Sequence, residues 1–171
     1  RERIEASILS LTPVTETLKP EAVRPQVYRA ELEGAVVLRS RIVVPLSGSE
    51  AAQANAALAA ATLNGLRVDA GETLSFNQTV GLRTSEAGYQ AAEEPAYGQN
   101  VSGVGGGVCQ VSTALYRLAL LGGLEIGERN AAVYPVDYCD VGQEAAVSDQ
   151  GLDLKIVNST GMPVFLTARV Y

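Results

Sequence analysis

The stretch GVGGGVCQVSTALY, residues 103–116, joins a glycine-rich turn directly to an apolar segment with helical spacing. Val111, Leu115 and Leu118 recur at intervals of four and three residues, which places them on one side of a helix and predicts that this side is buried. Gly122 and the glycine after it mark the expected end of the helix. We therefore predict a helix from about 108 to 121 that follows a tight turn.

Cys109, one of two cysteines in the chain, lies where this turn meets the helix. A helix N-terminus leaves free N–H groups and a partial positive charge, and both stabilise a thiolate. Cys109 is therefore a candidate catalytic nucleophile. The chain contains no histidine, so Asp137, Asp140 or Glu144 would have to supply the proton, with a pKa raised by burial.

Polar side chains on the same side of the predicted helix indicate a cleft. Offsets of three, four and seven residues from Cys109 bring three hydroxyl groups onto its face. The turn either faces a ligand, such as an anion at the helix N-terminus, or packs its backbone closely against a neighbouring strand. The residues assigned to the cleft are Gly105, Gly106, Gly107, Gln110, Ser112, Thr113 and Tyr116.

A second helix is predicted over residues 50–64, between Ser49 and Gly65. Asn55 lies on its inner stripe together with Leu58, so it needs hydrogen-bond partners if it is buried. Asn55 therefore joins the predicted cleft residues.

The two cysteines allow one disulfide. A bond between Cys109 and Cys139 would close a loop of about thirty residues and stabilise the protein by roughly 3–4 kcal/mol in the chain-entropy model. It would also remove the Cys109 thiol from any chemistry.

Composition excludes several classes of protein. The 171 residues are 47% hydrophobic, which excludes disorder, and 13 basic against 19 acidic residues give a net charge of −6. With no basic cluster, nucleic acid and anionic membrane surfaces are not expected partners. No apolar run reaches the roughly 20 residues of a membrane span. Because the chain starts at Arg1 rather than Met, we expect a fragment that lacks its signal peptide or anchor.

No cofactor or metal is predicted. The glycine turn lacks the Lys-Ser/Thr of a phosphate-binding loop and the spacing of a dinucleotide fingerprint. Two cysteines about thirty residues apart and no histidine do not provide a zinc ligand set.

The remaining pattern predicts an α+β fold, with the two main helices packed on a mostly antiparallel sheet. Residues 1–34 are expected to form a connecting segment, and residues 35–171 the domain. We expect residues 78–102 to be a long surface loop and the C-terminal strands to form an antiparallel meander. The expected strands are 27–32, 35–44, two within 66–77, 131–138, 145–147, 152–157 and 164–170.

The chain carries a series of short motifs, which are GETLSFNQTVG (71–81), GY (88–89), GGGVCQVSTALY (105–116), GLEI (123–126), ER (128–129) and LDLK (152–155). Together these motifs resemble the VanW-like family of bacterial envelope proteins, and the resemblance covers about residues 35–171. It implies an exported or membrane-anchored protein, located in the periplasm or at the cell surface, but no settled activity. A cysteine at the start of a helix followed by strands also looks like the core of transglutaminase- and papain-like folds.

The chain departs from the family pattern after Glu128-Arg129. Family members resemble Glu-Arg-His-x-His at this place, whereas here Asn130, Ala131 and Ala132 follow. If the family members are cysteine enzymes, this chain has lost its base, which is typical of a pseudoenzyme.

These observations predict a non-catalytic, extracytoplasmic module that binds a cell-wall component or an envelope protein. Two alternatives stay open. One is a cysteine-dependent acyl transferase or hydrolase acting on peptidoglycan peptides, and the other is a structural subunit of an envelope assembly.

Overall fold

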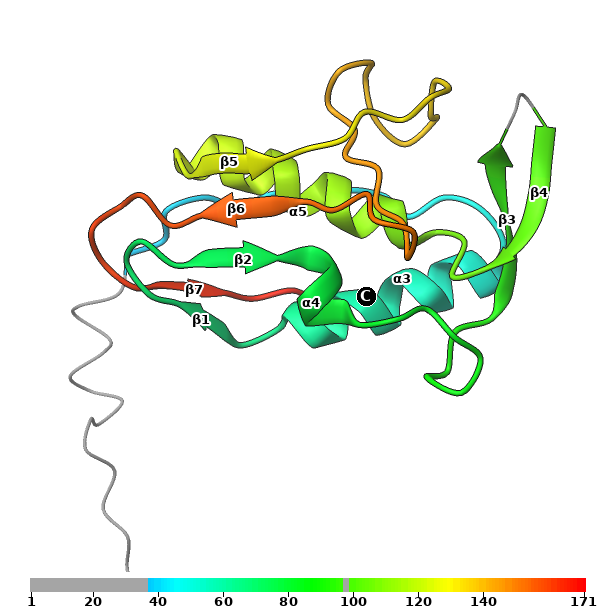
Figure 1. Ribbon diagram of the computed structural model, residues 1–171, viewed down its shortest axis with the longest axis horizontal. Helices are drawn as coiled ribbons and strands as arrows, with labels where there is room; N and C mark the ends of the chain where they lie inside the picture. Colours follow the sequence, from blue (N-terminus) through cyan, green and yellow to red (C-terminus); the bar gives the residue numbers. More distant parts are fainter. Residues whose placement is uncertain (1–36, 97–98) are drawn as a thin grey trace, which may run out of the picture. The chain divides into compact units, whose positions relative to one another are not determined.

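The computed structural model describes residues 37–96 and 99–171, and Leu38–Tyr171 form one compact unit (Figure 1). Within these residues the fold is α+β, as predicted, with three helices and three small antiparallel sheets. The predicted strand at 27–32 and the segment 1–34 lie outside them. In this part of the chain no helix is long and apolar enough to cross a membrane. The elements are α3 (Glu50–Leu63), β1 (Leu66–Val68), β2 (Thr73–Ser75), α4 (Phe76–Val80), β3 (Ala91–Ala96), β4 (Gln99–Val104), α5 (Val108–Gly122), β5 (Glu125–Glu128), β6 (Lys155–Val157) and β7 (Val164–Leu166).

Helix α3 begins where the sequence predicts. The Ser49 hydroxyl accepts the Ala52 N–H at 3.3 Å, which satisfies one of the free donors of the first turn. Most of the helix is alanine, the residue with the highest helix propensity. Ala56 and Ala59 are fully buried, and their small side chains let other backbone segments approach α3 closely.

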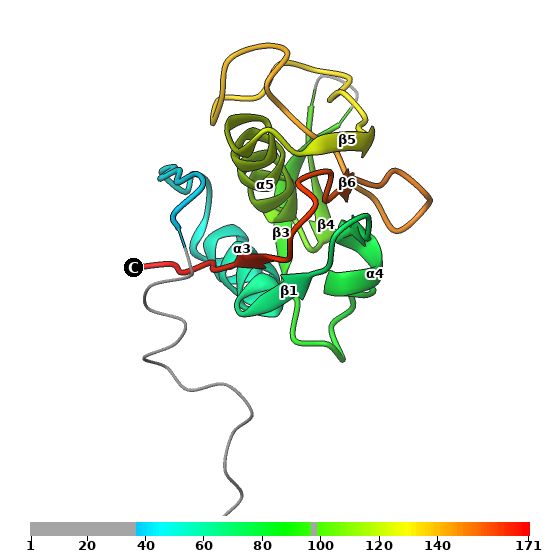
Figure 2. The same cartoon turned by 90° about the vertical axis from the view of Figure 1, so that its left-hand side faces the viewer.

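Helix α5 confirms the prediction from the glycine turn. Val111 and Leu115 are buried in the core, and Gly123 ends the helix in the left-handed region, at φ 65°. Its N–H bonds to the carbonyls of Ala119 and Leu120, as is common at helix C-termini. Because α5 packs against both α3 and β5, the two main helices share one core (Figure 2).

Two strand pairs, β1-β7 and β2-β6, join distant parts of the chain, whereas β3-β4 and β5-β6 pair consecutive strands. The three-stranded sheet has the order β2-β6-β5, and β1 pairs with β7. Leu74 lies opposite Ile156, and Leu66 lies opposite Leu166. The predicted C-terminal meander is therefore wrong, because β6 and β7 find apolar partners in the first half of the chain.

Residues 78–102, predicted as a loop, contain regular structure. Ser75 caps α4, in which Phe76 and Val80 are buried one turn apart, and β3 and β4 form an antiparallel hairpin. The small and acidic residues of β3 have low strand propensity, so the sequence pattern does not indicate this hairpin.

The predicted strand at 35–44 is wrong for its described residues. Residues 37–47 form an extended segment that pairs with no described strand and lies along α5 in the opposite direction. The Ser40 hydroxyl donates to the Leu118 carbonyl at 3.1 Å, and Ser47 meets Gln110 near the other end of the helix. Hydrogen bonds with helix α5, rather than with a strand, hold this segment in place.

Four predicted C-terminal strands are shorter than expected or absent. Residues 131–138 and 145–147 form no strand, and only Lys155–Val157 and Val164–Leu166 remain of the other two. A transglutaminase- or papain-like core is not supported, because α5 is followed by β5 and then by a segment without regular structure until β6. Of the described strands that follow the cysteine helix, β5 and β6 pair with each other and with β2, whereas β7 pairs with β1.

Candidate functional site

The glycine turn before α5 is packed against three other segments. A Cβ at Gly105 would lie 2.7 Å from the Arg83 Cβ, and a Cβ at Gly106 would lie 2.8 Å from the Ala92 carbonyl oxygen. At Gly107, where φ is 100°, a Cβ would collide with the Ala52 carbonyl. Of the two alternatives left open for the turn, close backbone packing is the arrangement seen here.

Asn55 joins α3 to the start of β3 and to the glycine turn. Its side chain is 1% exposed, and its amide donates to the carbonyls of Gln90 and Gly106, both at 2.9 Å. Its oxygen accepts the Gln90 N–H at 2.8 Å. The partners expected for a buried asparagine are therefore all backbone groups of this chain.

Gln110 holds the extended segment against α5. Its oxygen accepts the Ser47 N–H at 2.8 Å, and its amide donates to the Ser47 carbonyl at 3.1 Å. Both backbone groups of one residue are thus bonded to one buried side chain, as in a strand pair.

Ser112 and Thr113 hold Ala145 in the same way. The Ser112 hydroxyl donates to the Ala145 carbonyl at 2.6 Å, and the Thr113 hydroxyl accepts the Ala145 N–H at 3.0 Å. Both side chains are buried. The sequence identified these polar residues, and the structure shows that they bind backbone segments of the chain itself.

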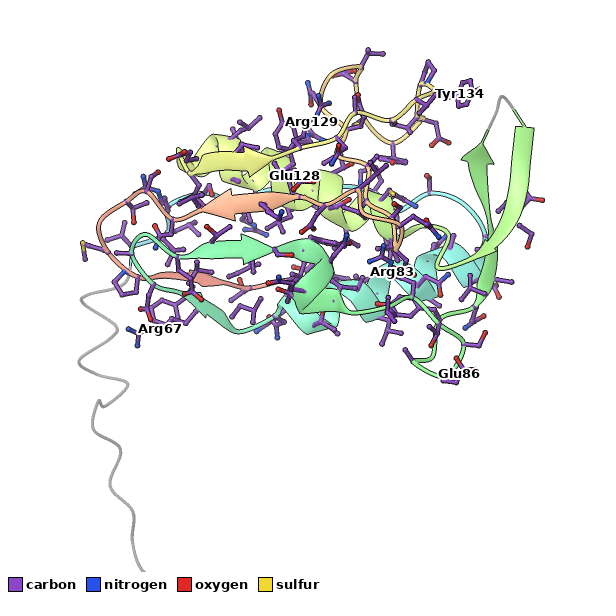
Figure 3. The ribbon with its side chains drawn as sticks, viewed as in Figure 1. Arg67, Arg83, Glu86, Glu128, Arg129 and Tyr134 are labelled. Atoms are coloured by element: carbon purple, nitrogen blue, oxygen red, sulfur yellow. The ribbon has the colours of Figure 1, made fainter. Side chains whose placement is uncertain are left out.

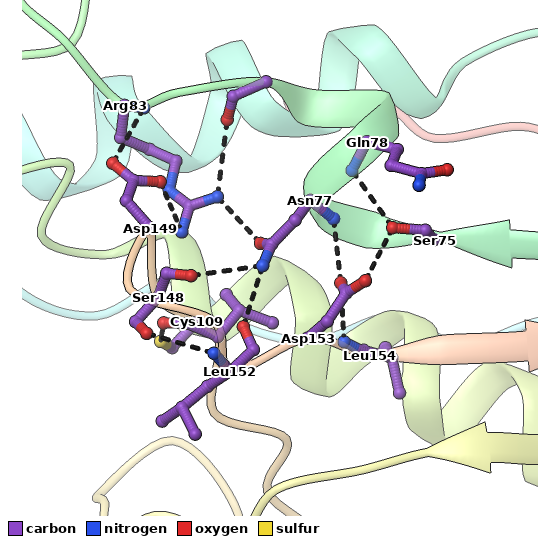
Figure 4. Close-up of polar contacts among 12 residues, drawn as sticks. Ser75, Asn77, Gln78, Arg83, Cys109, Ser148, Asp149, Leu152, Asp153 and Leu154 are labelled. Carbon is purple, nitrogen blue, oxygen red and sulfur yellow. Dashed lines mark hydrogen bonds and ion pairs between the residues drawn. The ribbon is translucent and has the colours of Figure 1, made fainter.

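Cys109 is half-buried at the start of α5, where Gly107 provides no side-chain cap. Its sulfur donates to the Val147 carbonyl at 3.5 Å, next to the polar contacts drawn in Figure 4. A carbonyl oxygen accepts a hydrogen bond but does not take up the proton at neutral pH. This contact therefore provides the sulfur with a hydrogen-bond acceptor but not with a base.

Tyr138 comes close to Cys109 from the irregular segment after β5. Burial, and secondarily the nearby Cys109, raise the pKa of its hydroxyl well above the ordinary value, while a hydrogen bond with Thr113 lowers it. The hydroxyl is therefore neutral at physiological pH and can donate a hydrogen bond.

A shallow depression with no room for a water molecule lies between α5 and the extended segment. Arg117 is half-buried there and forms no hydrogen bond or ion pair within residues 37–96 and 99–171. Tyr116, the remaining predicted cleft residue, lies elsewhere, with its ring centre 5.3 Å from the Arg129 guanidinium carbon. The residues lining the depression are Val44, Pro45, Gln110, Thr113, Ala114, Arg117 and Tyr138.

The three acidic residues expected to replace a histidine do not have the environment that a general acid requires. Glu144 accepts its own backbone N–H and the Gly142 N–H and pairs with Arg129 at 3.0 Å, and these contacts hold its pKa below the ordinary value. A general acid would need the opposite shift. Asp137 and Asp140 are exposed.

Asn130, at the position where the resemblance expects histidine, bonds to neighbouring acidic residues. Its amide donates to the Glu128 carboxylate at 3.2 Å and to the Asp153 carbonyl at 2.9 Å. Glu128 and Arg129 lie close together beyond α5 in Figure 3.

The predicted disulfide is not present in the structure, where Cys109 and Cys139 are separate side chains. Burial and the nearby Glu144 raise the pKa of the Cys139 thiol. Among the described residues, no cluster of three potential metal ligands occurs.

A buried polar network around Asp153 was not predicted. Asp153 accepts the Ser75 hydroxyl at 2.6 Å and the N–H groups of Asn77 and Leu154 at 2.9 and 2.8 Å (Figure 4). These residues stand in two of the motifs that carry the family resemblance, FNQ after Ser75 and LDLK. The presence of these residues in two family motifs is the signal in the sequence that could have indicated the network.

The Asp153 network continues through an ion pair. Asn77 accepts from Arg83 at 2.8 Å, and the Arg83 guanidinium, which is 6% exposed, pairs with Asp149 at 2.7 Å. Asn77 also donates to the carbonyls of Ser148 and Leu152. The network thus fastens the C-terminal half of the domain to α4.

Taken with the fold, these contacts define a class: a small α+β domain in which buried polar side chains tie a cysteine-bearing helix to backbone segments from both halves of the chain. The chain belongs to the VanW-like family, whose model, described as VanW like protein, matches residues 51–171.

Two curated relatives are similar to this chain. The uncharacterized protein YoaR of Bacillus subtilis is 36% identical over 125 residues, which cover 73% of this chain and 41% of YoaR. The vancomycin B-type resistance protein VanW of Enterococcus faecalis is 36% identical over 111 residues, which cover 62% of this chain and 40% of that protein. The matched region thus spans about two fifths of each relative. No solved structure matches significantly.

Proposed function

We propose that this chain is a non-catalytic VanW-like module of the bacterial cell envelope that binds a component of the cell wall. The observation that carries the proposal is the contact of Cys109 with the Val147 carbonyl at 3.5 Å. It places a carbonyl oxygen rather than a base beside the thiol, in a chain without histidine. Binding requires neither a thiolate nor a base.

An extracytoplasmic location is supported by the family. The relative from E. faecalis is named as a vancomycin resistance protein, and the VanW-like family resembles proteins of the bacterial envelope. We therefore place this domain outside the cytoplasm and name the wall as its ligand, with an envelope protein as the other partner to be tested.

The depression beside α5 is the surface best suited to a ligand. The polar groups of Asn55 and Ser112 are buried and bonded to the chain itself. Gln110 and Thr113 are also buried and bonded to the chain itself, and of the predicted cleft residues these two line the depression.

A cysteine-dependent acyl transferase is the second candidate. It is favoured by the position of Cys109, half-buried in the first turn of a helix whose N-cap has no side-chain bond. In that mechanism the helix N-terminus would have to lower the thiol pKa without an imidazole partner.

Sedimentation with purified bacterial cell walls tests the proposal. We expect the chain to sediment with the walls, and Ala114→Glu, which fills the depression with a charged side chain, to reduce the bound fraction several-fold. Ala61→Glu is the matched control, because Ala61 is exposed on α3, and it should bind normally.

The Cys109→Ala variant separates the two candidates. We expect it to bind walls as the wild type does. Absence of wall binding by the wild type, or release of wall peptides that disappears in Cys109→Ala, would overturn the proposal.

A further inference from the structure

We propose that Asn64 and Gly65, at the junction of α3 and β1, are a site of spontaneous deamidation, and that pairing with the β7 segment sets its rate. The sequence contains six asparagines, and Asn64 is the one that glycine follows. The reaction requires the backbone nitrogen of the next residue to reach the asparagine side chain. Glycine, which has no Cβ, obstructs this approach least.

The reaction consumes water and releases ammonia. The Gly65 amide nitrogen loses its proton to solvent base and attacks the Asn64 Cγ, which forms a five-membered succinimide and expels the side-chain nitrogen as ammonia. Water then opens the ring at one of its two carbonyls. The product is either aspartate or isoaspartate, in which the main chain runs through Cβ. Both products carry a new negative charge.

The surroundings of Asn64 leave room for this chemistry. Asn64 and Gly65 are both exposed, and a Cβ at Gly65 would meet nothing within 4 Å. Asn158 provides a contrast within the same chain. It is 1% exposed, and its amide donates to the carbonyls of Val68 and Met162 at 2.9 and 2.7 Å. The fold therefore exposes Asn64 to solvent and holds Asn158 in place.

Two hydrogen bonds to the β7 segment hold Asn64 and Gly65 in an unreactive arrangement. The Gly65 N–H donates to the Leu166 carbonyl at 2.9 Å, and the Asn64 Oδ1 accepts the Ala168 N–H at 3.1 Å. The first bond must break before the Gly65 nitrogen can lose its proton and attack. Asn64 also has an extended backbone, with ψ 125°, so its Cα–C bond must rotate before the ring can close.

The opening that the reaction requires is local. Strand β7 has three residues, and among the described strands it pairs with β1 alone (Figure 1). Phe165, in the middle of β7, is 55% exposed. A two-stranded ladder is marginally stable by itself, and segments with few buried contacts open more often than the whole domain unfolds. We therefore expect Asn64 to react in the folded protein.

Deamidation in turn weakens the pairing that slows it. In isoaspartate the main chain between α3 and β1 is longer by one carbon atom. This insertion moves the Gly65 N–H away from the Leu166 carbonyl and disturbs the pairing of Leu66 with Leu166. Because the ammonia is lost to solvent, the chain does not revert by itself. The modified protein therefore holds β7 less tightly, and permanently so.

The experiment incubates the full chain at mildly alkaline pH, with and without urea, and follows every asparagine by peptide mapping and mass spectrometry. Deamidation adds about 1 Da, and chromatography separates the isoaspartate peptide from the aspartate peptide. We expect Asn64 to react about ten- to a hundredfold more slowly in the folded protein than in urea. A reaction through global unfolding would be slower by at least about 10³-fold. Asn158 should stay unmodified without urea.

Variants test the control by the β7 segment. Ala168→Pro removes the N–H that Asn64 accepts, and it should accelerate the reaction several-fold in the folded protein while leaving the rate in urea unchanged. Ala168→Ser is the matched control, because it keeps this N–H, and it should react as the wild type does. Asn64→Gln should abolish the reaction at this position, because glutamine would have to close a six-membered ring. Thermal melts of the variants verify the fold.

The rates decide the inference. Equal rates with and without urea would show that β7 does not protect Asn64. No reaction in the folded protein, while the sample in urea reacts, would show that global unfolding is required. Equal rates for Ala168→Pro and Ala168→Ser would show that the bond to Ala168 has no control. Each of these results overturns the inference, and none bears on wall sedimentation, which tests the proposed function separately.

Discussion

Replacing Asn55 with alanine removes the side chain that holds the glycine turn and the start of β3 to helix α3. Three hydrogen bonds of 2.8–2.9 Å to Gln90 and Gly106 are lost. Each contributes about 1 kcal/mol net, and the cavity left at a fully buried site adds about 1 kcal/mol. We therefore expect Asn55→Ala to lower the free energy of unfolding by about 4 kcal/mol, a large part of the 5–15 kcal/mol typical of a domain.

Urea unfolding followed by circular dichroism measures this loss. With a slope of about 2 kcal/mol per molar urea, the midpoint should fall by about 2 M. Gln53→Ala is the matched control on the same helix, because Gln53 is exposed and makes a single bond to the Gly48 carbonyl at 3.1 Å. We expect this control to lose less than about 0.5 kcal/mol.

A second substitution tests the role of Asn55 by replacing its amide with a carboxylate. Asn55→Asp keeps the acceptor for the Gln90 N–H but turns a carboxylate toward the Gln90 and Gly106 carbonyls. Burial and this repulsion raise the folded-state pKa above the unfolded value, so the variant loses stability as the pH rises through that range. The deficit relative to wild type should be smaller at pH 4 than at pH 7. A cost below about 1 kcal/mol for Asn55→Ala, or no pH dependence for Asn55→Asp, would refute the assigned role.

Two other predictions concern backbone packing and pH. Gly107→Ala should cost more than about 3 kcal/mol or prevent folding, since it combines a positive φ with a collision against the Ala52 carbonyl. Gly142→Ala, with a similar φ of 88° and open space around it, should cost only about 1–2 kcal/mol in the same urea assay. For Glu144 the folded-state pKa is lowered, so its stabilisation is present above the ordinary value of 4.5 and disappears as the pH falls below it. Glu144→Gln should flatten this acid-side loss in unfolding curves recorded between pH 6 and pH 3, and an unchanged slope would contradict the assignment.

The two main helices, α3 and α5, were predicted well because their signals are local, whereas α4 was not predicted. The spacing of Val111 and Leu115, the glycines after α5 and the serine before α3 specify each helix within a few residues of sequence. Strand pairing depends on distant residues instead. β6 lies between β2 and β5, which precede it by about eighty and thirty residues, and no turn signal records that choice.

In the candidate site, too, single residues could be predicted from the sequence, whereas their distant partners could not. Asn55 was expected to need partners if buried, and it has them, because a buried amide must be satisfied. The polar residues of α5 were predicted instead to line a cleft. Their partners are backbone groups of Ser47, Gln90 and Ala145, which were predicted to lie in a loop or in strands. Arg117 was missed because a single arginine on a helix carries no pattern.

The sequence by itself determined the two main helices, the α+β class, the resemblance to the VanW-like family and the lack of an imidazole. Only the tertiary structure decided that the glycine turn is packed shut, that Cys109 meets a carbonyl, and that Arg117 lacks a carboxylate partner in the described chain. The physical reason is the separation along the chain over which each kind of interaction acts. Propensity and capping act over a few residues along the chain, whereas packing, hydrogen bonding and desolvation act between groups that only folding brings together.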